Sequence, residues 1–265
     1  MKALFLIVCV SLTLIASAQA QPDANLRIFP ESISTVDNVT AGFVNPAGLA
    51  LPFVMGFRYM HAYSDSSLGG DDGVILATRG NLVSIQWLKN GDGIFRRKYL
   101  LAGGKRLVPR LYWGISYAWF GGSNEKYRKK KTWTIGFLYF ARNDLSIGWV
   151  VDDLNRPKFG EIQTERQYSA GATYSMLHGK ANFSADFAIG EKSNLKKTQS
   201  RFRLEVTPVS YLKIAADYSN DGYFRIGLAG IFGYIDMGFG NEMTTSKFTG
   251  GNFYYNQGPV RSKGE

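Results

Sequence analysis

Along most of the chain, bulky and small side chains alternate with a period of two residues. In the run LYWGISYAW, residues 111–119, one face carries Leu, Trp, Ile, Tyr and Trp, and the other carries mainly Gly, Ser and Ala. Runs at 131–142, 144–152 and 180–190 repeat this pattern. A period of two with one bulky face predicts β-strands that are buried on one side. The alternation therefore predicts an all-β protein.

The number and length of these runs indicate how the strands are used. About fourteen runs are present, or twelve if two of them are not strands, and most span nine to twelve residues. A tilted strand needs roughly 9–11 residues to cross a bilayer, whereas strands of soluble proteins average about five or six. The expected strands are 53–64, 71–79, 81–90, 95–105, 109–120, 131–142, 144–152, 165–176, 180–190, 199–207, 210–219, 222–230, 233–241 and 248–256.

Ionisable residues occupy the face opposite the bulky side chains on several of these strands. A soluble sandwich would put such charges in solvent, whereas a membrane barrel turns bulky side chains to lipid and polar ones to the lumen. We therefore expect a transmembrane antiparallel β-barrel, and a soluble periplasmic β-protein remains the weaker alternative. The polar residues expected in the lumen are Arg201, Arg203, Glu205, Lys213 and Asp217.

The connections between the expected strands are sorted by length. Longer polar loops alternate with short links, as in outer-membrane barrels, whose short turns face the periplasm and whose longer loops face outward. The connection at 220–221 breaks this alternation, because it is short at a place where the order of the strands predicts a long loop. The longer loops are 65–70, 121–130, 153–164, 191–198 and 242–247.

Basic residues gather in the loops expected on the outer side, and the chain has a formal net charge of +10. The run Arg128, Lys129, Lys130 and Lys131 would lie at the outer rim. There it would pair with anionic membrane lipids and with lipopolysaccharide phosphates, or it is simply solvated loop charge. Nucleic acid is not an expected partner of an exported chain.

The first twenty residues read as a cleaved secretory signal peptide. Lys2 supplies a positive start, residues 3–15 are almost wholly apolar, and Ala18-Gln19-Ala20 is a small-x-small cleavage site. Cys9, which is the only cysteine, lies inside the apolar run, so the mature chain would hold no disulfide. The expected location is the cell outer membrane.

Residues 21–51 precede the first expected strand and have no place in the barrel wall. Asn45 and Pro46 suit the N-cap and first position of a short helix, because proline lacks the N–H that is unsatisfied there. We expect 21–51 to form a hatch or plug, with an ordinary loop as the alternative. Residues 52–257 would form the barrel and 258–265 a C-terminal tail.

The stretch NVTAGFVNPAGLA, followed directly by a strand, resembles the N-terminal hatch of the long-chain fatty-acid transporter superfamily of outer-membrane proteins. That superfamily includes aromatic-hydrocarbon channels and adapter barrels of the type IX secretion system. Asn45-Pro46-Ala47 is similar to its Asn-Pro-Ala signature in residues and position. The resemblance implies a fourteen-stranded wall, which agrees with the count of runs.

Two functions follow from the resemblance. The first is passive uptake of hydrophobic small molecules, gated by movement of the hatch residues Phe43, Val44, Asn45, Pro46, Ala47, Gly48 and Leu49. The second is a non-transporting adapter or scaffold for exported or surface proteins. The charged inner face favours this second class, or a plugged lumen, over an apolar conduit.

No catalytic or metal-binding constellation stands out in the sequence. His61 and His178 are the only histidines, and neither belongs to a pair with metal-ligand spacing. Gly114-Ile115-Ser116-Tyr117-Ala118 lacks the second glycine of a nucleophile elbow. We therefore expect neither an enzyme nor a cofactor.

Overall fold

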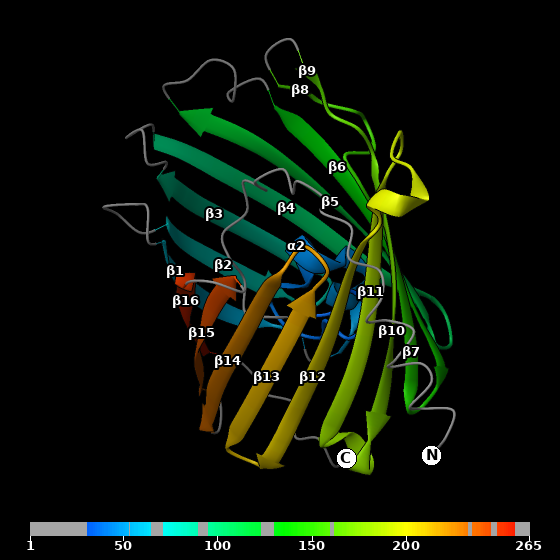
Figure 1. Ribbon diagram of the computed structural model, residues 1–265, viewed down its shortest axis with the longest axis vertical. Coiled ribbons are helices and arrows are strands. Elements are labelled where there is room, and N and C mark those ends of the chain that lie inside the picture. The colour runs from blue at the N-terminus through cyan, green and yellow to red at the C-terminus, as the bar shows by residue number, and fades with distance from the viewer. Residues whose placement is uncertain are drawn as a thin grey trace.

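The computed structural model describes residues 31–52, 54–64, 71–89, 95–122, 130–159, 162–232, 235–244 and 248–257. The predicted signal peptide and the tail 258–265 lie outside these residues. Fourteen strands form one closed barrel in which every neighbouring pair is antiparallel (Figure 1). The barrel strands are β1 (Gly56–Ser64), β2 (Asp71–Thr78), β3 (Asn81–Lys89), β4 (Phe95–Val108), β5 (Leu111–Gly122), β6 (Lys131–Arg142), β7 (Leu145–Asp152), β10 (Gln167–Met176), β11 (Ala181–Gly190), β12 (Gln199–Val209), β13 (Leu212–Ser219), β14 (Tyr223–Phe232), β15 (Ile235–Thr244) and β16 (Phe248–Gln257).

The barrel closes where its first strand pairs with its last. Each strand pairs with its neighbours in sequence order, and β1 pairs with both β2 and β16. Within the closing pair, Phe57 lies across from Gln257 and His61 from Phe253. Closure leaves no open sheet edge, which a wall immersed in lipid requires. The predicted all-β class, the barrel and the count of fourteen strands are confirmed.

The barrel is apolar outside and ionised inside. Trp149 and Phe187 on the outer face are 43% and 45% exposed. Arg58 and Asp217 on the inner face are only 1% and 2% exposed. A soluble protein has the opposite distribution, since large apolar side chains are its most buried and charged ones its most exposed. The predicted orientation of the two faces is therefore confirmed, and it is that of a membrane-spanning barrel.

The expected strands differ from the observed ones mainly at their ends. β1 begins at Gly56, although the sequence suggested a start near residue 53. β4 continues to Val108 and β12 to Val209, so these strands include residues 106–108 and 208–209, which were expected to be links. The register shifts at both of these ends, which allows a strand to continue where strict alternation stops.

The connection after β7 also departs from its prediction as a plain loop. It contains a small separate hairpin of two short strands, β8 (Lys158–Phe159) and β9 (Ile162–Gln163). This hairpin projects at one end of the barrel beyond β6 (Figure 1).

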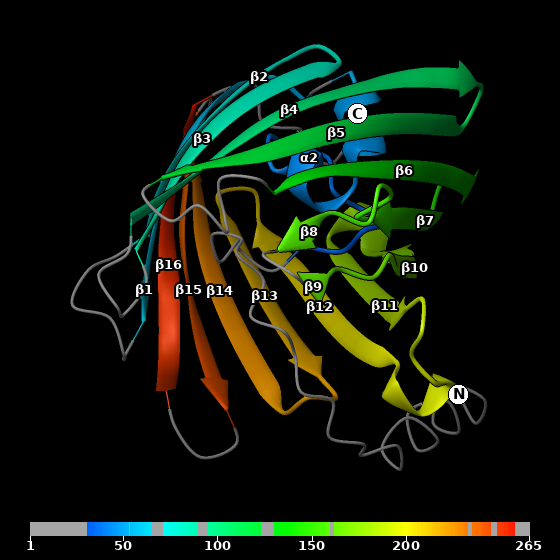
Figure 2. The same ribbon diagram turned by 90° about the horizontal axis from the view of Figure 1, so that it is seen from above.

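Residues 31–52 lie inside the ring of strands, where the blue N-terminal elements appear in both views (Figures 1 and 2). They form a short α-helix, α2 (Ala41–Val44), and a 3-10 helix, η1 (Pro46–Ala50). Two short 3-10 helices lie outside the hatch, η2 (Leu177–Gly179) and η3 (Leu195–Lys197). In the described part of the chain, none of the helices has the length and apolar character needed to cross a bilayer.

Candidate functional site

Asn45 organises the inner segment, which we call the hatch and define as residues 31–52. Its side-chain Oδ1 accepts a hydrogen bond from the backbone N–H of Ala47 at 3.1 Å, and Pro46 occupies the first turn of η1. The N-cap and proline predicted from the sequence are thus both present. Asn45 Nδ2 donates to the carbonyls of Ile33 at 2.7 Å and Phe137 at 3.0 Å. One buried side chain therefore caps the helix, folds the hatch on itself and ties it to β6.

The hatch rests on a track of glycines in the barrel wall. Gly104, Gly114 and Gly136 lie directly across from one another on β4, β5 and β6, and Gly148 lies across from Gly171 on β7 and β10. We call these five residues the glycine track.

The hatch approaches this track more closely than a side chain on the wall would allow. A Cβ atom at Gly114 would lie 2.3 Å from the carbonyl carbon of Pro46, and one at Gly148 would lie 2.3 Å from the carbonyl oxygen of Ile33. At Gly136 the same atom would meet Asn45 Oδ1 at 2.1 Å. Glycine is therefore required at these positions for the hatch to sit where it does.

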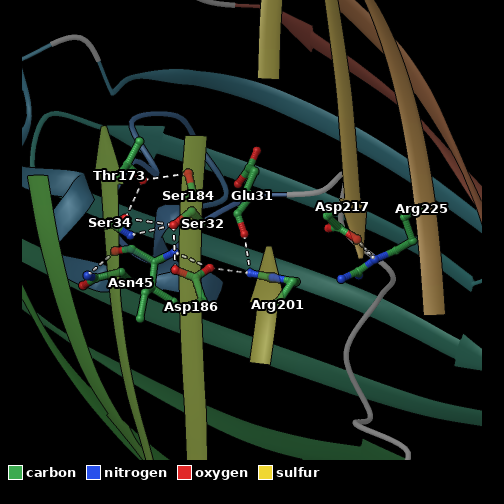
Figure 3. Close-up of polar contacts among 11 residues, drawn as sticks. Glu31, Ser32, Ser34, Asn45, Thr173, Ser184, Asp186, Arg201, Asp217 and Arg225 are labelled. Carbon is green, nitrogen blue, oxygen red and sulfur yellow. Dashed lines mark hydrogen bonds and ion pairs between the residues drawn. The ribbon is translucent and has the colours of Figure 1, made fainter. Parts of the chain in front are cut away.

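A chain of hydroxyl groups joins the start of the hatch to β10 and β11 (Figure 3). Ser34 Oγ and Thr173 Oγ1 are 2.6 Å apart, and Thr173 in turn donates to Ser184 at 2.7 Å. Ser32 donates to Asp186 Oδ1 at 2.7 Å. These polar groups are fully or nearly fully buried, so each bond is shielded from competing water.

Glu31 connects the hatch to two further strands, β1 and β12. Its carboxylate accepts from Asn38 at 2.6 Å and from the Thr40 hydroxyl, and it lies 3.8 Å from the guanidinium of Arg58 on β1. Its carbonyl accepts from Arg201 on β12 at 2.6 Å (Figure 3). The hatch is thus fixed at several points around the lumen, which it crosses.

Strands β11–β14 present ion pairs to the lumen. Arg201 pairs with Asp186 at 3.0 Å, and Arg225 pairs with Asp217 at 2.9 Å (Figure 3). Glu205 accepts from Arg203 on its own strand and lies 4.0 Å from Lys213. All five residues predicted to line the lumen therefore face inward.

The wall on the other side of the lumen is apolar where the hatch lies against it, although Gln86, Arg96 and Lys98 of β3 and β4 are also buried and face the lumen. Lumen-facing residues of β2–β6 form one core with the hatch, and they include Ile75, Leu82, Leu100 and Leu138. Leu49 of the hatch is fully buried in this core. Phe43 and Val44 are half-buried and pack against it. The lumen is consequently two-sided, with an ionised wall on β11–β14 and, next to the hatch, an apolar wall on β2–β6.

The basic run predicted for the outer rim divides between the two faces of the barrel. Arg128 and Lys129 lie outside the described residues. The Lys130 ammonium is 5.7 Å from the ring of Phe120, which faces the lumen. Lys131 lies across from Trp119 on the outer face of β5. Neighbouring lysines thus point to different surroundings, which their position in a run of basic residues does not reveal.

Two sets of residues at this site were absent from the sequence prediction. Glu31, Asp186 and Arg58 were not assigned to the site. The glycine track was missed as well. Its signal was available, since each of its glycines stands at a lumen-facing position of a strand whose outer face is bulky.

The described residues contain no group of three or more His, Cys, Asp or Glu side chains placed to hold a metal ion. The polar groups of the site are instead bonded to one another. The arrangement is therefore suited to holding one segment of chain inside a barrel.

No family model matches the sequence, and no curated protein matches it. Solved structures do resemble it. The CymD monoaromatic hydrocarbon channel superimposes with a TM-score of 0.51 at 7% identity, over 84% of this chain and 94% of that one. The outer membrane protein Omp33 of Acinetobacter baumannii gives a TM-score of 0.52 at 10% identity, over 77% of this chain and 98% of that one. At such identities the likeness concerns the fold, which is that of outer-membrane β-barrels.

Proposed function

We propose that the protein is an outer-membrane barrel for the passive uptake of hydrophobic small molecules, with the hatch as its gate. The observation that carries this proposal is the seated hatch, which crosses the lumen of a closed barrel and is bonded to its wall. A barrel plugged in this way conducts only when the plug moves. The gating residues are those of the motif, Phe43 to Leu49, together with Glu31.

The two-sided lumen supports a hydrophobic permeant. The wall that the hatch covers is apolar at Ile75, Leu82 and Leu100 and bare backbone along the glycine track. Movement of the hatch would uncover this surface without breaking the ion pairs between neighbouring strands of the opposite wall. The resemblance in fold to a hydrocarbon channel is in keeping with such a permeant. The proposal includes export of the chain through a cleaved signal peptide and its location in the outer membrane.

A second candidate, a non-transporting adapter or scaffold, is favoured by the way the hatch is held. The backbone of the hatch lies against Gly104, Gly114 and Gly148, and its polar groups bond to four strands, β6, β10, β11 and β12. A hatch that never leaves this seat would make the barrel a closed platform in the membrane.

A disulfide across the hatch and the wall separates the two functions. The hydroxyl oxygens of Ser34 and Thr173 are 2.6 Å apart, close to the roughly 2.05 Å between the sulfurs of a disulfide, so the double variant S34C/T173C is placed to cross-link. Gram-negative cells that carry the variant are assayed for the initial rate of uptake of a fatty acid and of an aromatic hydrocarbon. The single variants S34C and T173C serve as controls.

Gating by the hatch predicts that uptake falls on oxidation of the double variant and returns with reductant. Uptake that is unchanged while the cross-link is complete shows that the hatch is not the gate. If neither the wild type nor a variant lacking residues 31–52 takes up either compound, passive uptake is refuted and the adapter function is favoured.

A further inference from the structure

Four aromatic side chains form a continuous stack on the outer face of β4, β5 and β6. The ring of Tyr99 lies 5.2 Å from that of Trp119, and Trp119 lies 5.5 Å from Tyr117. Tyr117 lies 4.6 Å from Trp133. The rings of Tyr99, Trp119 and Tyr117 are near parallel, at 16° and 26° between planes. They form an aromatic cluster on the face of the wall that points away from the lumen.

Two exposed cations border this stack. Arg97 is the next outward-facing residue beyond Tyr99 on β4, and Lys131 lies directly across from Trp119. Arg97 lies across from Gly121, which has no side chain to separate it from the rings. Among the residues that the structure describes, neither Arg97 nor Lys131 is paired with a carboxylate. Both side chains are exposed, so an anion outside the barrel wall can reach them.

The position of Arg97 along β4 places it at an edge of the apolar belt. Tyr99, Leu101 and Gly103 follow it on the outward face, and the next outward residue is the exposed Lys105. Eight residues at about 3.4 Å each span roughly 27 Å along a strand, or roughly 20 Å along the membrane normal at a tilt of ~40°. That height is close to the ~25 Å apolar band of outer-membrane barrels. Arg97 and Lys105 thus mark the two membrane boundaries.

Arg97 is at the outer of these two boundaries. The Lys105 end of β4 leads into the two-residue turn Pro109-Arg110, and short turns face the periplasm in such barrels. The Arg97 end belongs to the side that carries the longer connections. In an outer membrane, the head groups at that level are phosphorylated glycolipids.

The outer end of β6 is held in place by the connection that follows β7. The side chain of Asn155 donates to the carbonyl of Lys131 at 2.8 Å and accepts from the backbone N–H of Trp133 at 3.1 Å. The Thr132 hydroxyl between them donates to Asp153. The backbone that carries Lys131 and Trp133 is therefore fixed before any ligand arrives, which lowers the entropy lost on binding.

We propose that this surface is a binding site for the phosphorylated sugar head group of an outer-leaflet glycolipid. Arg97 and Lys131 donate charge-assisted hydrogen bonds to phosphate oxygens. The aromatic cluster contacts the sugar ring, and the acyl chains lie along Leu101 and Ile115 below it. The inference rests on the outer-membrane placement given under the proposed function, but it does not require that the barrel transport anything.

The test is equilibrium binding of bisphosphorylated lipid A to the purified barrel in non-ionic detergent micelles. Variants R97Q and K131Q each remove one cation, and K105Q removes the cation at the other membrane boundary of the same strand as a matched control. We expect each of the first two to weaken binding about tenfold and the double variant R97Q/K131Q to weaken it at least that much, with K105Q unchanged. Wild-type affinity should also fall for lipid A that lacks its phosphates.

Three results would overturn the proposal. Equal loss in K105Q would show that net charge alone attracts the lipid. Equal affinity for phosphatidylglycerol would remove the role of the sugar. Unchanged affinity in the double variant would place any lipid A site elsewhere. Because binding is measured in micelles, a barrel that binds lipid A but takes up no solute separates failure of the proposed function from failure of this site.

Discussion

Replacement of Gly114 by alanine should unseat the hatch without disturbing the barrel. The added Cβ would lie 2.3 Å from the carbonyl carbon and oxygen of Pro46 and 2.6 Å from the nitrogen of Ala47. Ordinary contact begins at 3.4 Å, so the hatch must retreat by about 1 Å. The clashing atoms are backbone, and no flexible side chain can turn aside to relieve the contact.

The energetic effect follows from this retreat. A displacement of about 1 Å lengthens the 3.0 Å bond from Asn45 to the Phe137 carbonyl beyond hydrogen-bonding range. Overpacking costs roughly 1–3 kcal/mol and the lost bond about 1 kcal/mol more. The seated state should therefore lose roughly 2–4 kcal/mol, which shifts its ratio to the unseated state about 30- to 700-fold.

A buried cysteine in the hatch reports this shift. Ala47 is fully buried, so a maleimide reaches an A47C reporter only when the hatch leaves its seat. The labelling rate in A47C/G114A should exceed that in A47C by about the same 30- to 700-fold. The matched control is G103A on the adjacent strand, where the added Cβ makes its nearest contacts at 3.7 Å and 3.8 Å. Equal labelling rates in the G114A and G103A backgrounds would refute the argument that the glycine track seats the hatch.

Three further changes test other parts of the site. E31Q removes the carboxylate beside the buried Arg58 guanidinium, and loss of a buried partner of this kind costs roughly 3 kcal/mol. Maleimide labelling of A47C should therefore be faster in E31Q. An unchanged rate would mean that Arg58 is neutralised elsewhere. N45A removes the helix cap and two further hydrogen bonds of the hatch. On heating, the hatch should therefore unfold at a lower temperature than the barrel. A single transition for both would contradict this expectation. Hydrogen bonds from Arg156 lower the pKa of Glu191 below its usual value of 4.5, so their link contributes stability at neutral pH that is lost as the pH falls through the lowered pKa. The amide protection factors at 153–159, corrected for the intrinsic pH dependence of exchange, should hold down to about pH 4.5 and then fall. In E191Q they should be low already at pH 7, and equal protection in E191Q and the wild type would contradict this role of the link.

The strands were predictable because their signal is local. The alternation in 111–119 places Ser116 and Ala118 on one face and Tyr117 and Trp119 on the other, whatever the rest of the chain does. All fourteen barrel strands correspond to expected runs, and the errors fall at ends such as Val108 and Val209, where a register shift interrupts the period. Asn45 and Pro46 were also readable, because capping depends only on the residues next to it.

The candidate site was less predictable because its contacts join distant parts of the chain. Ser32 and Asp186 are 154 residues apart, and Glu31 and Arg201 are 170 apart. The need for glycine at a lumen-facing position depends on what lies against it. Gly148 is required only because the backbone of Ile33 packs onto it. The strands of the small hairpin β8–β9 have two residues each, which is too few to show an alternating pattern.

The sequence by itself determined that this chain forms strands long enough to cross a membrane, with apolar side chains on one face and ionised ones on the other, because side-chain alternation is a property of neighbouring residues. The tertiary structure alone decided what occupies the lumen, which ions pair, and that Lys130 and Lys131 serve opposite faces. Those features arise from barrel closure, which brings strands from all along the chain around one segment, and no local pattern encodes which residues then meet.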